Sequence, residues 1–241
     1  MTAQIEYVPE TGSTNADLIA RLAAGELVPE GAWLVADRQT AGRGRHGRSW
    51  IDAAGNFMGS TVVELRERDP APATLSFVAA LAVYETVLPM LPNPAALMLK
   101  WPNDVLLNGA KFCGLLLERE QGHAVIGIGV NLVAAPDIAE RKVKSLADNG
   151  PAPARDAFAK ALAAQFAIEL QRWREFGDGP IFNRWKAAAH QTGTPLAVHD
   201  AGGAPLSGTY DGLTSDGALR LRLPDGTTHI VHAGDVMLEE S

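Results

Sequence analysis

The segment between Leu97 and Val130 constrains the fold more than any other part of the sequence. It contains four apolar runs of strand length in close succession, at Leu97–Trp101, Val105–Leu107, Phe112–Glu118 and Ala124–Val130. Asn108-Gly109 separates the second run from the third, and this dipeptide favours the tight turn of a β-hairpin. The segment therefore predicts neighbouring strands of a β-sheet.

Further elements are expected on both sides of this segment. Strands are predicted at Ile5–Val8, Trp33–Ala36 and Asn56–Leu65, and helices after Ser13-Thr14-Asn15, from Thr74 to about Leu88, at Ala154–Phe176 and at Ile181–His190. After Gly193, short strands alternate with expected turns at Asp211-Gly212, Asp216-Gly217 and Asp225-Gly226. This spacing indicates a small SH3-like β-barrel that begins near Thr192.

The composition disfavours several functions for the chain as a whole. Its 241 residues are 46% hydrophobic, which is enough for one large domain and a small one. The net charge of −7 opposes binding of nucleic acid over the whole surface. The N-terminal residues show no signal-peptide pattern, and the longest apolar runs are expected to be too short to span a membrane. The single cysteine cannot form an internal disulfide. We therefore expect a cytoplasmic protein that binds neither nucleic acid nor membrane.

The most informative motif is a basic, glycine-rich stretch inside this acidic protein. Gly42-Arg43-Gly44-Arg45-His46-Gly47-Arg48-Ser49-Trp50 combines three arginines with three glycines. A guanidinium donates two hydrogen bonds to one carboxylate or phosphate, and glycines let backbone N–H groups approach an anion closely. The stretch is typical of a loop that closes over an anionic ligand, with Trp50 as an apolar anchor.

Three other interpretations of this loop compete with anion binding. A short charge run is usually a solvated surface, and arginine–glycine repeats beside an aromatic residue also occur in nucleic-acid contacts. The spacing of Gly42, Gly44 and Gly47 fits a dinucleotide-binding fingerprint, which requires a helix directly afterwards. Residues 48–56 have no apolar period, so the fingerprint is rejected. The loop by itself leaves anion binding and surface charge both open.

Three more segments carry polar residues at or near predicted strand ends. Pro102 ends or kinks a strand, which exposes Asn103 and Asp104, although these residues also suit an ordinary turn. Lys111 begins the strand after the hairpin and is either directed at a phosphate or exposed to solvent. Residues 127–131 end another strand in an amide, and their glycines could serve sheet packing alone.

Together these segments resemble the biotin–protein ligases (biotin–[acetyl-CoA-carboxylase] ligases). The resemblance extends from near the N-terminus to about residue 131 and rests on five motifs in the family's order and approximate spacing. They are Ser13-Thr14-Asn15, Gln39–Trp50 with its Gly-Arg-Gly-Arg-x-Gly core, Lys100–Asp104, Lys111-x-x-Gly114 and Gly127-x-Gly129-x-Asn131. Each motif alone is weak or moderate, but five in order argue strongly against chance.

The resemblance implies a fold and a reaction. The fold is of the α+β class, with a mixed β-sheet catalytic domain that has helices packed on one side, followed by the SH3-like domain. Residues 1–191 would form the first domain and residues 192–241 the second. The biotin carboxylate would attack the α-phosphate of MgATP to give biotinyl-5′-AMP and pyrophosphate. A lysine of the biotin carboxyl carrier protein or domain of acetyl-CoA carboxylase, or of a similar enzyme, would then accept the biotin and release AMP.

The resemblance also implies ligands and roles for individual residues. ATP and Mg²⁺ are the implied cofactors, with Mg²⁺ carried by ATP and no separate metal site. Biotin would be bound by Ser13, Thr14, Asn15, Gln39, Gly42, Arg43, Gly44, Arg45, Asp104, Lys111 and Gly114. ATP and the adenylate would be bound by Arg45, Arg48, Trp50, Lys111 and Asn131.

Three of these residues, Arg45, Arg48 and Lys111, are the implied catalytic residues. Adenylation brings a carboxylate and a phosphate together, so positive charge in a water-poor site must offset their repulsion. Asp104 would either accept a hydrogen bond from a ureido N–H of biotin or position the incoming lysine, and both interpretations stay open here.

Other functions are compatible with parts of the pattern. Lipoate–protein ligases use the same chemistry on the same fold, but the Gly-Arg-Gly-Arg loop and Lys-Trp-Pro-Asn-Asp favour biotin. Related transferases use a cysteine nucleophile, and Cys113 lies two residues from Lys111, so both side chains could project from one strand face. A small buried filler is the favoured interpretation of Cys113.

A non-enzymatic nucleic-acid-binding protein is the alternative of another class, and the acidic net charge disfavours it. Some members of the family carry an N-terminal DNA-binding domain of about 60 residues. Because Ser-Thr-Asn already begins at residue 13, we expect a ligase without such a domain. Both a monomer and a homodimer are compatible with the sequence.

Overall fold

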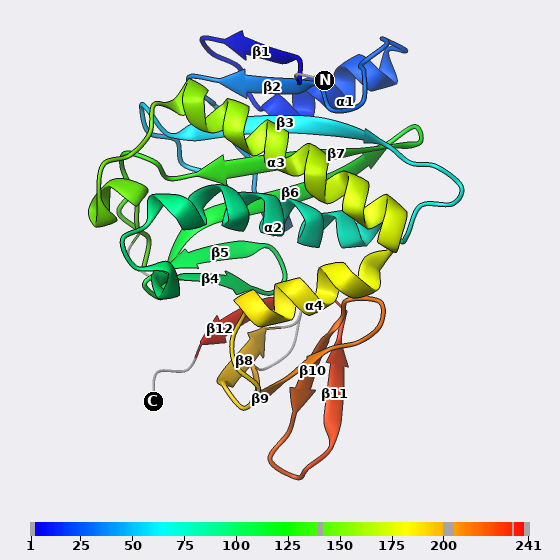
Figure 1. Cartoon of the computed structure of the whole chain (residues 1–241), viewed down its shortest axis with the longest axis vertical. Coiled ribbons are helices and arrows are strands. Elements are labelled where there is room, and N and C mark those ends of the chain that lie inside the picture. The colour runs from blue at the N-terminus through cyan, green and yellow to red at the C-terminus, as the bar shows by residue number, and fades with distance from the viewer. Residues whose placement is uncertain (1–2, 139–141, 200–204, 233, 239–241) are drawn as a thin grey trace.

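The larger of two β-sheets contains seven strands and matches the mixed sheet that was expected (Figure 1). The computed structural model describes residues 3–138, 142–199, 205–232 and 234–238. In the order β1-β2-β3-β7-β6-β5-β4, the strands are β1 (Ile5–Val8), β2 (Trp33–Ala36), β3 (Phe57–Glu64), β7 (His123–Val130), β6 (Ala110–Glu120), β5 (Asp104–Leu107) and β4 (Leu97–Lys100). β1 and β2 are parallel, and the other neighbouring pairs are antiparallel.

Two local predictions within this sheet are confirmed. Asn108 and Gly109 join β5 to β6 with φ values of 50° and 73°, the left-handed conformations that a two-residue hairpin turn requires. β4 ends at Lys100, before Pro102, so that Asn103 and Asp104 follow at the end of the strand.

Helices lie on both faces of the sheet. α2 (Leu75–Val87), α3 (Arg155–Phe176) and α4 (Asp178–Ala188) cover one face, where they share a large apolar core with the sheet. α1 (Thr14–Ala23) packs on the opposite face, against Leu34, Val62 and Val125. Successive side chains of a strand point to opposite faces, so one strand can serve both layers. The expectation of helices on one side only is therefore wrong for α1.

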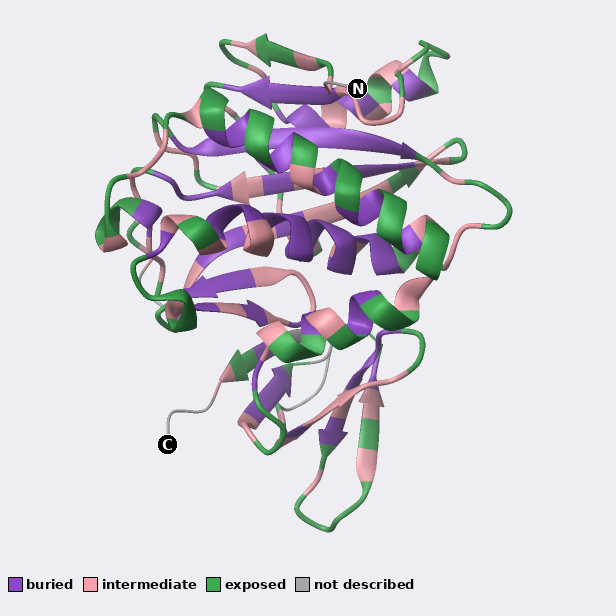
Figure 2. Cartoon of the chain, in the orientation of Figure 1, coloured by how far each residue is buried: buried purple, intermediate pink, exposed green. Residues whose placement is uncertain are grey.

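The apolar segment around α2 is longer than the sequence analysis allowed. Residues 72–90 are long and apolar enough to cross a membrane by length and composition, so the judgement that all apolar runs fall short was wrong. In the structure α2 is buried along almost its whole length between the sheet and the other helices (Figure 2). Its hydrophobicity is accounted for by its position in the core.

The second sheet is antiparallel and lies beyond α4 (Figure 1). In the order β11-β10-β9-β8-β12, its strands are β11 (Thr228–Val231), β10 (Leu219–Arg222), β9 (Leu206–Leu213), β8 (Pro195–His199) and β12 (Asp235–Leu238). Asp211-Gly212 is not a turn, because β9 continues through it at a register shift opposite β10. The division between residues 191 and 192 stays a prediction.

Candidate active site

A pocket lies on the face of the sheet that carries α1. Its floor consists of cross-strand neighbours, because residues that pair directly point to the same face. Gly114 of β6 pairs with Gly129 of β7 and with Asp104 of β5. In the next row, Gly127 of β7 pairs with Ser60 of β3. These strands therefore present glycines and polar groups here, while their other face belongs to the apolar core.

The glycines of the floor make room for two larger side chains. A Cβ atom on Gly129 would lie 2.4 Å from the Trp50 ring, and one on Gly114 would lie 3.0 Å from it. A Cβ atom on Gly127 would lie 2.6 Å from Asn15 Oδ1. Glycine is therefore required at these positions for the arrangement that the pocket has.

One end of the pocket is built from hydroxyls and amides. Ser13 is the N-cap of α1, which places Thr14 and Asn15 in the first turn of the helix at the pocket wall. Gln39 Oε1 accepts hydrogen bonds from the Thr14 backbone N–H at 2.7 Å and from its hydroxyl at 3.1 Å. Thr14 Oγ1 also lies 2.7 Å from Ser60 Oγ.

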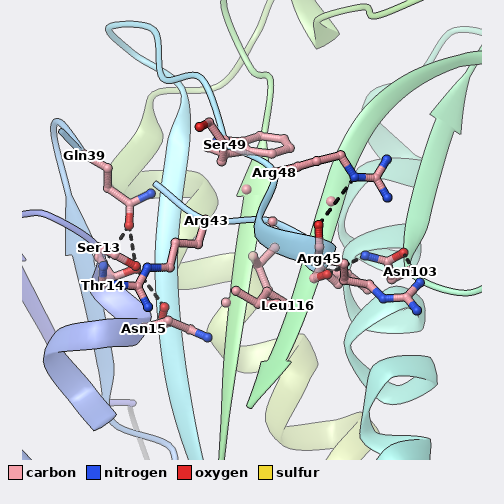
Figure 3. Close-up of a pocket in the computed structure, with 18 of the residues that line it drawn as sticks. Ser13, Thr14, Asn15, Gln39, Arg43, Arg45, Arg48, Ser49, Asn103 and Leu116 are labelled. Atoms are coloured by element: carbon pink, nitrogen blue, oxygen red, sulfur yellow. Dashed lines mark hydrogen bonds between the residues drawn. The ribbon is translucent and has the colours of Figure 1, made fainter. Parts of the chain in front are cut away.

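The polarity of this network follows from the acceptor that Gln39 supplies. The Thr14 hydroxyl donates to Gln39, so it accepts from Ser60 at the same time. Both bonds to Gln39 use its oxygen, which leaves the two N–H donors of its amide directed away from Thr14 (Figure 3). Gln39 therefore offers donors to a ligand.

Asn15 offers the opposite polarity. Its Nδ2 donates to Glu118 Oε2 at 2.7 Å, and its Oδ1 is buried without a hydrogen-bond partner among the residues that the structure describes. A buried acceptor without a donor is costly, so such an atom calls for a ligand or water that donates to it.

The basic loop crosses the pocket as a short, paired hairpin. Trp50 N–H donates to Gly42 O, and Gly44 N–H donates to Arg48 O at 2.7 Å. The turn between them, Arg45–Gly47, contains two left-handed residues, His46 at φ 56° and Gly47 at φ 71°. The next strand, β3, follows without an intervening helix, which agrees with the rejection of a dinucleotide-binding fingerprint.

The other end of the pocket is strongly cationic. Arg45, Arg48 and Lys111 line it, and Asp104 is the carboxylate among the lining residues described, whereas the Arg43 side chain reaches toward Ser13, Thr14 and Asn15 (Figure 3). Lys111 Nζ lies 2.6 Å from Asp104 Oδ1 and 6.0 Å from the centre of the Trp50 ring. Positive potential is thus concentrated in the pocket of a chain whose net charge is −7.

Arg45 connects the loop to two other parts of the molecule. Its Nη1 donates to Asn103 Oδ1 at 3.3 Å and to the carbonyl of Gly234 at 3.4 Å, next to β12 of the second sheet (Figure 3). Arg48 Nε in turn donates to the Arg45 carbonyl at 3.4 Å. The loop is therefore held against both sheets.

The structure brings together all the predicted site residues except Gly42 and Asn131. Ser13, Thr14, Asn15, Gln39, Arg43, Gly44, Arg45, Arg48, Trp50, Asp104, Lys111 and Gly114 line the pocket. Gly42 lies behind it, in contact with Gln39 and Trp50. Asn131 is 1% exposed, and its side chain bonds to Asn56 and to the Lys144 carbonyl, so the structure does not place it among the lining residues.

The expectation that Lys111 and Cys113 project from one strand face is wrong. β5 pairs Val105 with Cys113 but Leu106 with Lys111, so a bulge at Phe112 interrupts the alternation. Lys111 consequently reaches the pocket, whereas Cys113 is fully buried in the core. Burial raises the pKa of the Cys113 thiol far above its usual value despite the nearby Lys111. A protonated, enclosed thiol is no nucleophile, and the favoured interpretation of a buried filler agrees with this.

Ser60 and Glu118 were missed from the sequence. Ser60 is fully buried in the middle of β3, and Glu118 is a half-buried carboxylate near the end of β6. A polar residue within or at the end of a predicted strand was the available signal in both cases, because such residues need a partner when buried.

Comparison with known proteins connects this geometry to named families. Residues 13–131 match the Biotin/lipoate A/B protein ligase family, and residues 197–238 match the Biotin protein ligase C terminal domain. The chain is 42% identical to a biotin–[acetyl-CoA-carboxylase] ligase of Paracoccus denitrificans, with 94% of this chain and 97% of that protein covered. It is 38% identical to the ligase of the same name from Mycobacterium tuberculosis, over 97% of this chain and 88% of that protein.

A solved structure supports the fold. The biotin protein ligase from Aquifex aeolicus in complex with biotin and ATP superposes with a TM-score of 0.84 and 24% identity. The superposition covers 99% of each chain, so both sheets have counterparts in that protein.

Proposed function

Because this chain belongs to the biotin protein ligase family, we propose that it is a biotin–[acetyl-CoA-carboxylase] ligase, which uses ATP to attach biotin to a lysine of a carrier protein. The observation that carries the proposal is that one pocket has a neutral polar end and a cationic end. Hydroxyls and amides line one end, and the cationic side chains of Arg45, Arg48 and Lys111 line the other (Figure 3). Biotin has the matching halves, a neutral ureido ring and a carboxylate.

The neutral end supports biotin over lipoate. A ureido ring has one strong acceptor and two N–H donors, and a dithiolane ring has neither. Gln39 offers donors and Asn15 offers an acceptor, so both kinds of ureido atom find a partner. A site with such groups leaves them unpaired when it takes an apolar ring, which discriminates strongly against that ring.

The cationic end supports adenylation. An oxygen of the biotin carboxylate forms a bond to the α-phosphorus of ATP, the bond to the β-phosphate oxygen breaks, and pyrophosphate leaves. Both reactants are anions, and negative charge develops on the leaving group. We assign the offsetting charge to Arg45, Arg48 and Lys111, which lie at this end. Trp50 covers the floor and excludes water from the reacting atoms.

The second step transfers biotin to the carrier. The neutral amine of the carrier lysine attacks the acyl carbon of biotinyl-5′-AMP, the carbon–oxygen bond breaks, and AMP leaves. Asp104 lies at the cationic end, between Lys111 at 2.6 Å and Lys100 at 3.6 Å. Its pairing with two ammonium groups at this end favours positioning of the incoming lysine over contact with the ureido ring.

We propose that Mg²⁺ enters with ATP. Mg²⁺ prefers oxygen ligands, keeps several waters and is commonly held by substrate phosphates with few protein carboxylates. Asp104 is the carboxylate that the described lining offers, and it is already paired with Lys111. The role of Asn131 near phosphate or metal, the cytoplasmic location, the lack of a nucleic-acid partner and the choice between monomer and homodimer stay predictions.

Pyrophosphate release from MgATP by the purified protein tests the proposal. We expect release with biotin, none without acid, and none with lipoate at the same concentration. Subsequent transfer to the carrier domain of acetyl-CoA carboxylase completes the test. Release with lipoate alone would overturn the substrate, and no release with either acid would overturn the enzyme function.

A further inference from the structure

We propose that Glu118 is a positioning residue for biotin, which fixes the Asn15 amide so that Asn15 Oδ1 accepts a hydrogen bond from a ureido N–H. This inference rests on the proposed function and concerns a residue outside the pocket lining. It starts from two observations on one side chain. Asn15 Nδ2 donates to Glu118 Oε2 at 2.7 Å, and Asn15 Oδ1 is buried without a partner among the described residues.

Register places Glu118 behind Asn15. Along β6, Gly114, Leu116 and Glu118 point to the face that carries the pocket, and Glu118 pairs with Val125 of β7. Val125 packs against α1, whose first turn contains Asn15. Gly114 and Leu116 line the pocket, so Glu118 is the next residue on the same face, beneath the helix.

A carboxylate can hold a carboxamide in only one orientation. An ionised carboxylate accepts hydrogen bonds and cannot donate them, whereas a carboxamide has a donating and an accepting end. Glu118 therefore binds the Nδ2 end of Asn15 and turns the Oδ1 end away from itself. With a donor at position 118, or with no polar group there, the amide could rotate and offer N–H groups instead.

The accepting end lies at the pocket because of Gly127. Asn15 is 3% exposed, and both it and Gly127 line the pocket. The space that a Cβ atom on Gly127 would fill is occupied by Asn15 Oδ1, at 2.6 Å. The oxygen is therefore packed over the pocket floor, where no described protein donor satisfies it.

Glu118 thereby helps to set what the neutral end recognises. Gln39 is held by Thr14 so that it offers donors, and Asn15 is held by Glu118 so that it offers an acceptor. A ureido ring requires both kinds of partner, a donor for its carbonyl and acceptors for its N–H groups. Rotation of the Asn15 amide would place donor against donor at the ureido N–H and weaken binding of this ring in particular.

The first test compares Glu118→Leu with Glu118→Gln. In Glu118→Leu we expect the KM for biotin in pyrophosphate release to rise about tenfold with kcat nearly unchanged, because a binding contact is lost from ground and transition state alike. Glu118→Gln retains an accepting oxygen and should restore most of the affinity. Glu120→Leu is the matched control, since it removes the same charge from the same strand and should keep the wild-type KM.

A second measurement separates positioning from a general structural role. A biotin analogue with an oxygen in place of one ureido N–H lacks a donor, and wild-type protein should bind it more weakly than biotin in a direct titration. In Glu118→Leu this discrimination should shrink, and Asn15→Leu combined with Glu118→Leu should be no worse than Asn15→Leu alone.

Three results would overturn the assignment. They are an unchanged KM in Glu118→Leu, an equal loss of affinity for biotin and the analogue, or additive losses in the double variant. If Glu118→Leu does not fold, Glu118→Gln still tests the proposal. A folded Glu118→Gln protein that fails to bind biotin would contradict it. Failure of the wild-type protein to release pyrophosphate would instead count against the proposed function.

Discussion

On the face of the large sheet that α2, α3 and α4 cover, called the helical face below, β3 and β7 present Phe57 and Ile126 to the core, and both side chains are fully buried. On the opposite face, the same two strands present Ser60 and Gly129 to the pocket. Large apolar side chains fill the first face, whereas glycines and short polar side chains keep the second face open.

The alternation of side chains makes this separation possible. Because neighbours in a strand point to opposite faces, a residue can be chosen for the pocket without changing the residue beside it in the core. Substitutions on the pocket face should therefore change activity more than stability, and substitutions on the helical face should do the reverse. Three of the four predictions test this difference directly.

The largest effect is expected for Lys111→Met. Loss of the ammonium beside the reacting anions should lower the kcat of adenylation about 10²- to 10³-fold, while the fold is kept. Pyrophosphate release and thermal unfolding measure the two quantities. Arg119→Met is the control, because it removes one positive charge from an exposed position on the same strand. Equal activity of the two variants would contradict the role of Lys111.

The second prediction compares Gly129→Ala with Ile126→Val, both on β7. The new Cβ atom in Gly129→Ala would displace the Trp50 ring, and misplacement of this order costs about 10²-fold in kcat/KM. Ile126→Val should instead lower the unfolding free energy by about 0.5–1.5 kcal/mol and keep kcat/KM. Urea denaturation and steady-state kinetics of both proteins check this. A Gly129→Ala protein with wild-type kinetics would show that the pocket face tolerates an added methyl group, and would contradict this prediction.

The third prediction concerns pH and His190, which packs between the edge strand β4 and the second sheet, outside the helical face. His190 is 5% exposed beside Met98 and Tyr210, and burial together with the charge of Lys100 lowers its pKa from 6.5 to about 4. Between these values the unfolded chain binds more protons than the folded one, so stability falls as the pH is lowered. From pH 7 to pH 5 this residue should remove about 2 kcal/mol of unfolding free energy.

Urea denaturation at pH 7 and pH 5 measures this effect. His190→Asn should be less stable at pH 7 than the wild type but should lose less stability on acidification. An identical loss in both proteins would assign the pH dependence to other groups.

The smallest effect is expected for Cys113→Ala. The thiol is buried and protonated on the helical face, so kcat should stay within about twofold of the wild type, while the unfolding free energy falls by about 1 kcal/mol, as for a typical point substitution. Pyrophosphate release and urea denaturation check both values. A large loss of activity in a folded Cys113→Ala protein would bring back the cysteine nucleophile.

Features that depend on neighbouring residues could be predicted from the sequence. The apolar runs that form strands, the helix start at Ser13-Thr14-Asn15 and the Asn108-Gly109 hairpin are local patterns, and the structure agrees with all three. The residues indicated by the motifs also line the pocket, apart from Gly42 and Asn131, although Ser60 of the lining was not predicted. Such signals act through backbone conformation within a few residues, which is why they can be read without the fold.

The tertiary structure decided which of these residues meet and in what orientation. A bulge opposite β5 separates Lys111 from Cys113, although their spacing in a regular strand predicts a shared face. The partner of Asn15 is Glu118, 103 residues away, and no local pattern specifies that contact. Asn131 follows the end of a strand as expected, yet its amide bonds to the Lys144 carbonyl and to the Asn56 side chain. In a regular strand, sequence spacing determines which residues share a face. Register shifts and contacts between distant segments depend instead on how the whole core packs.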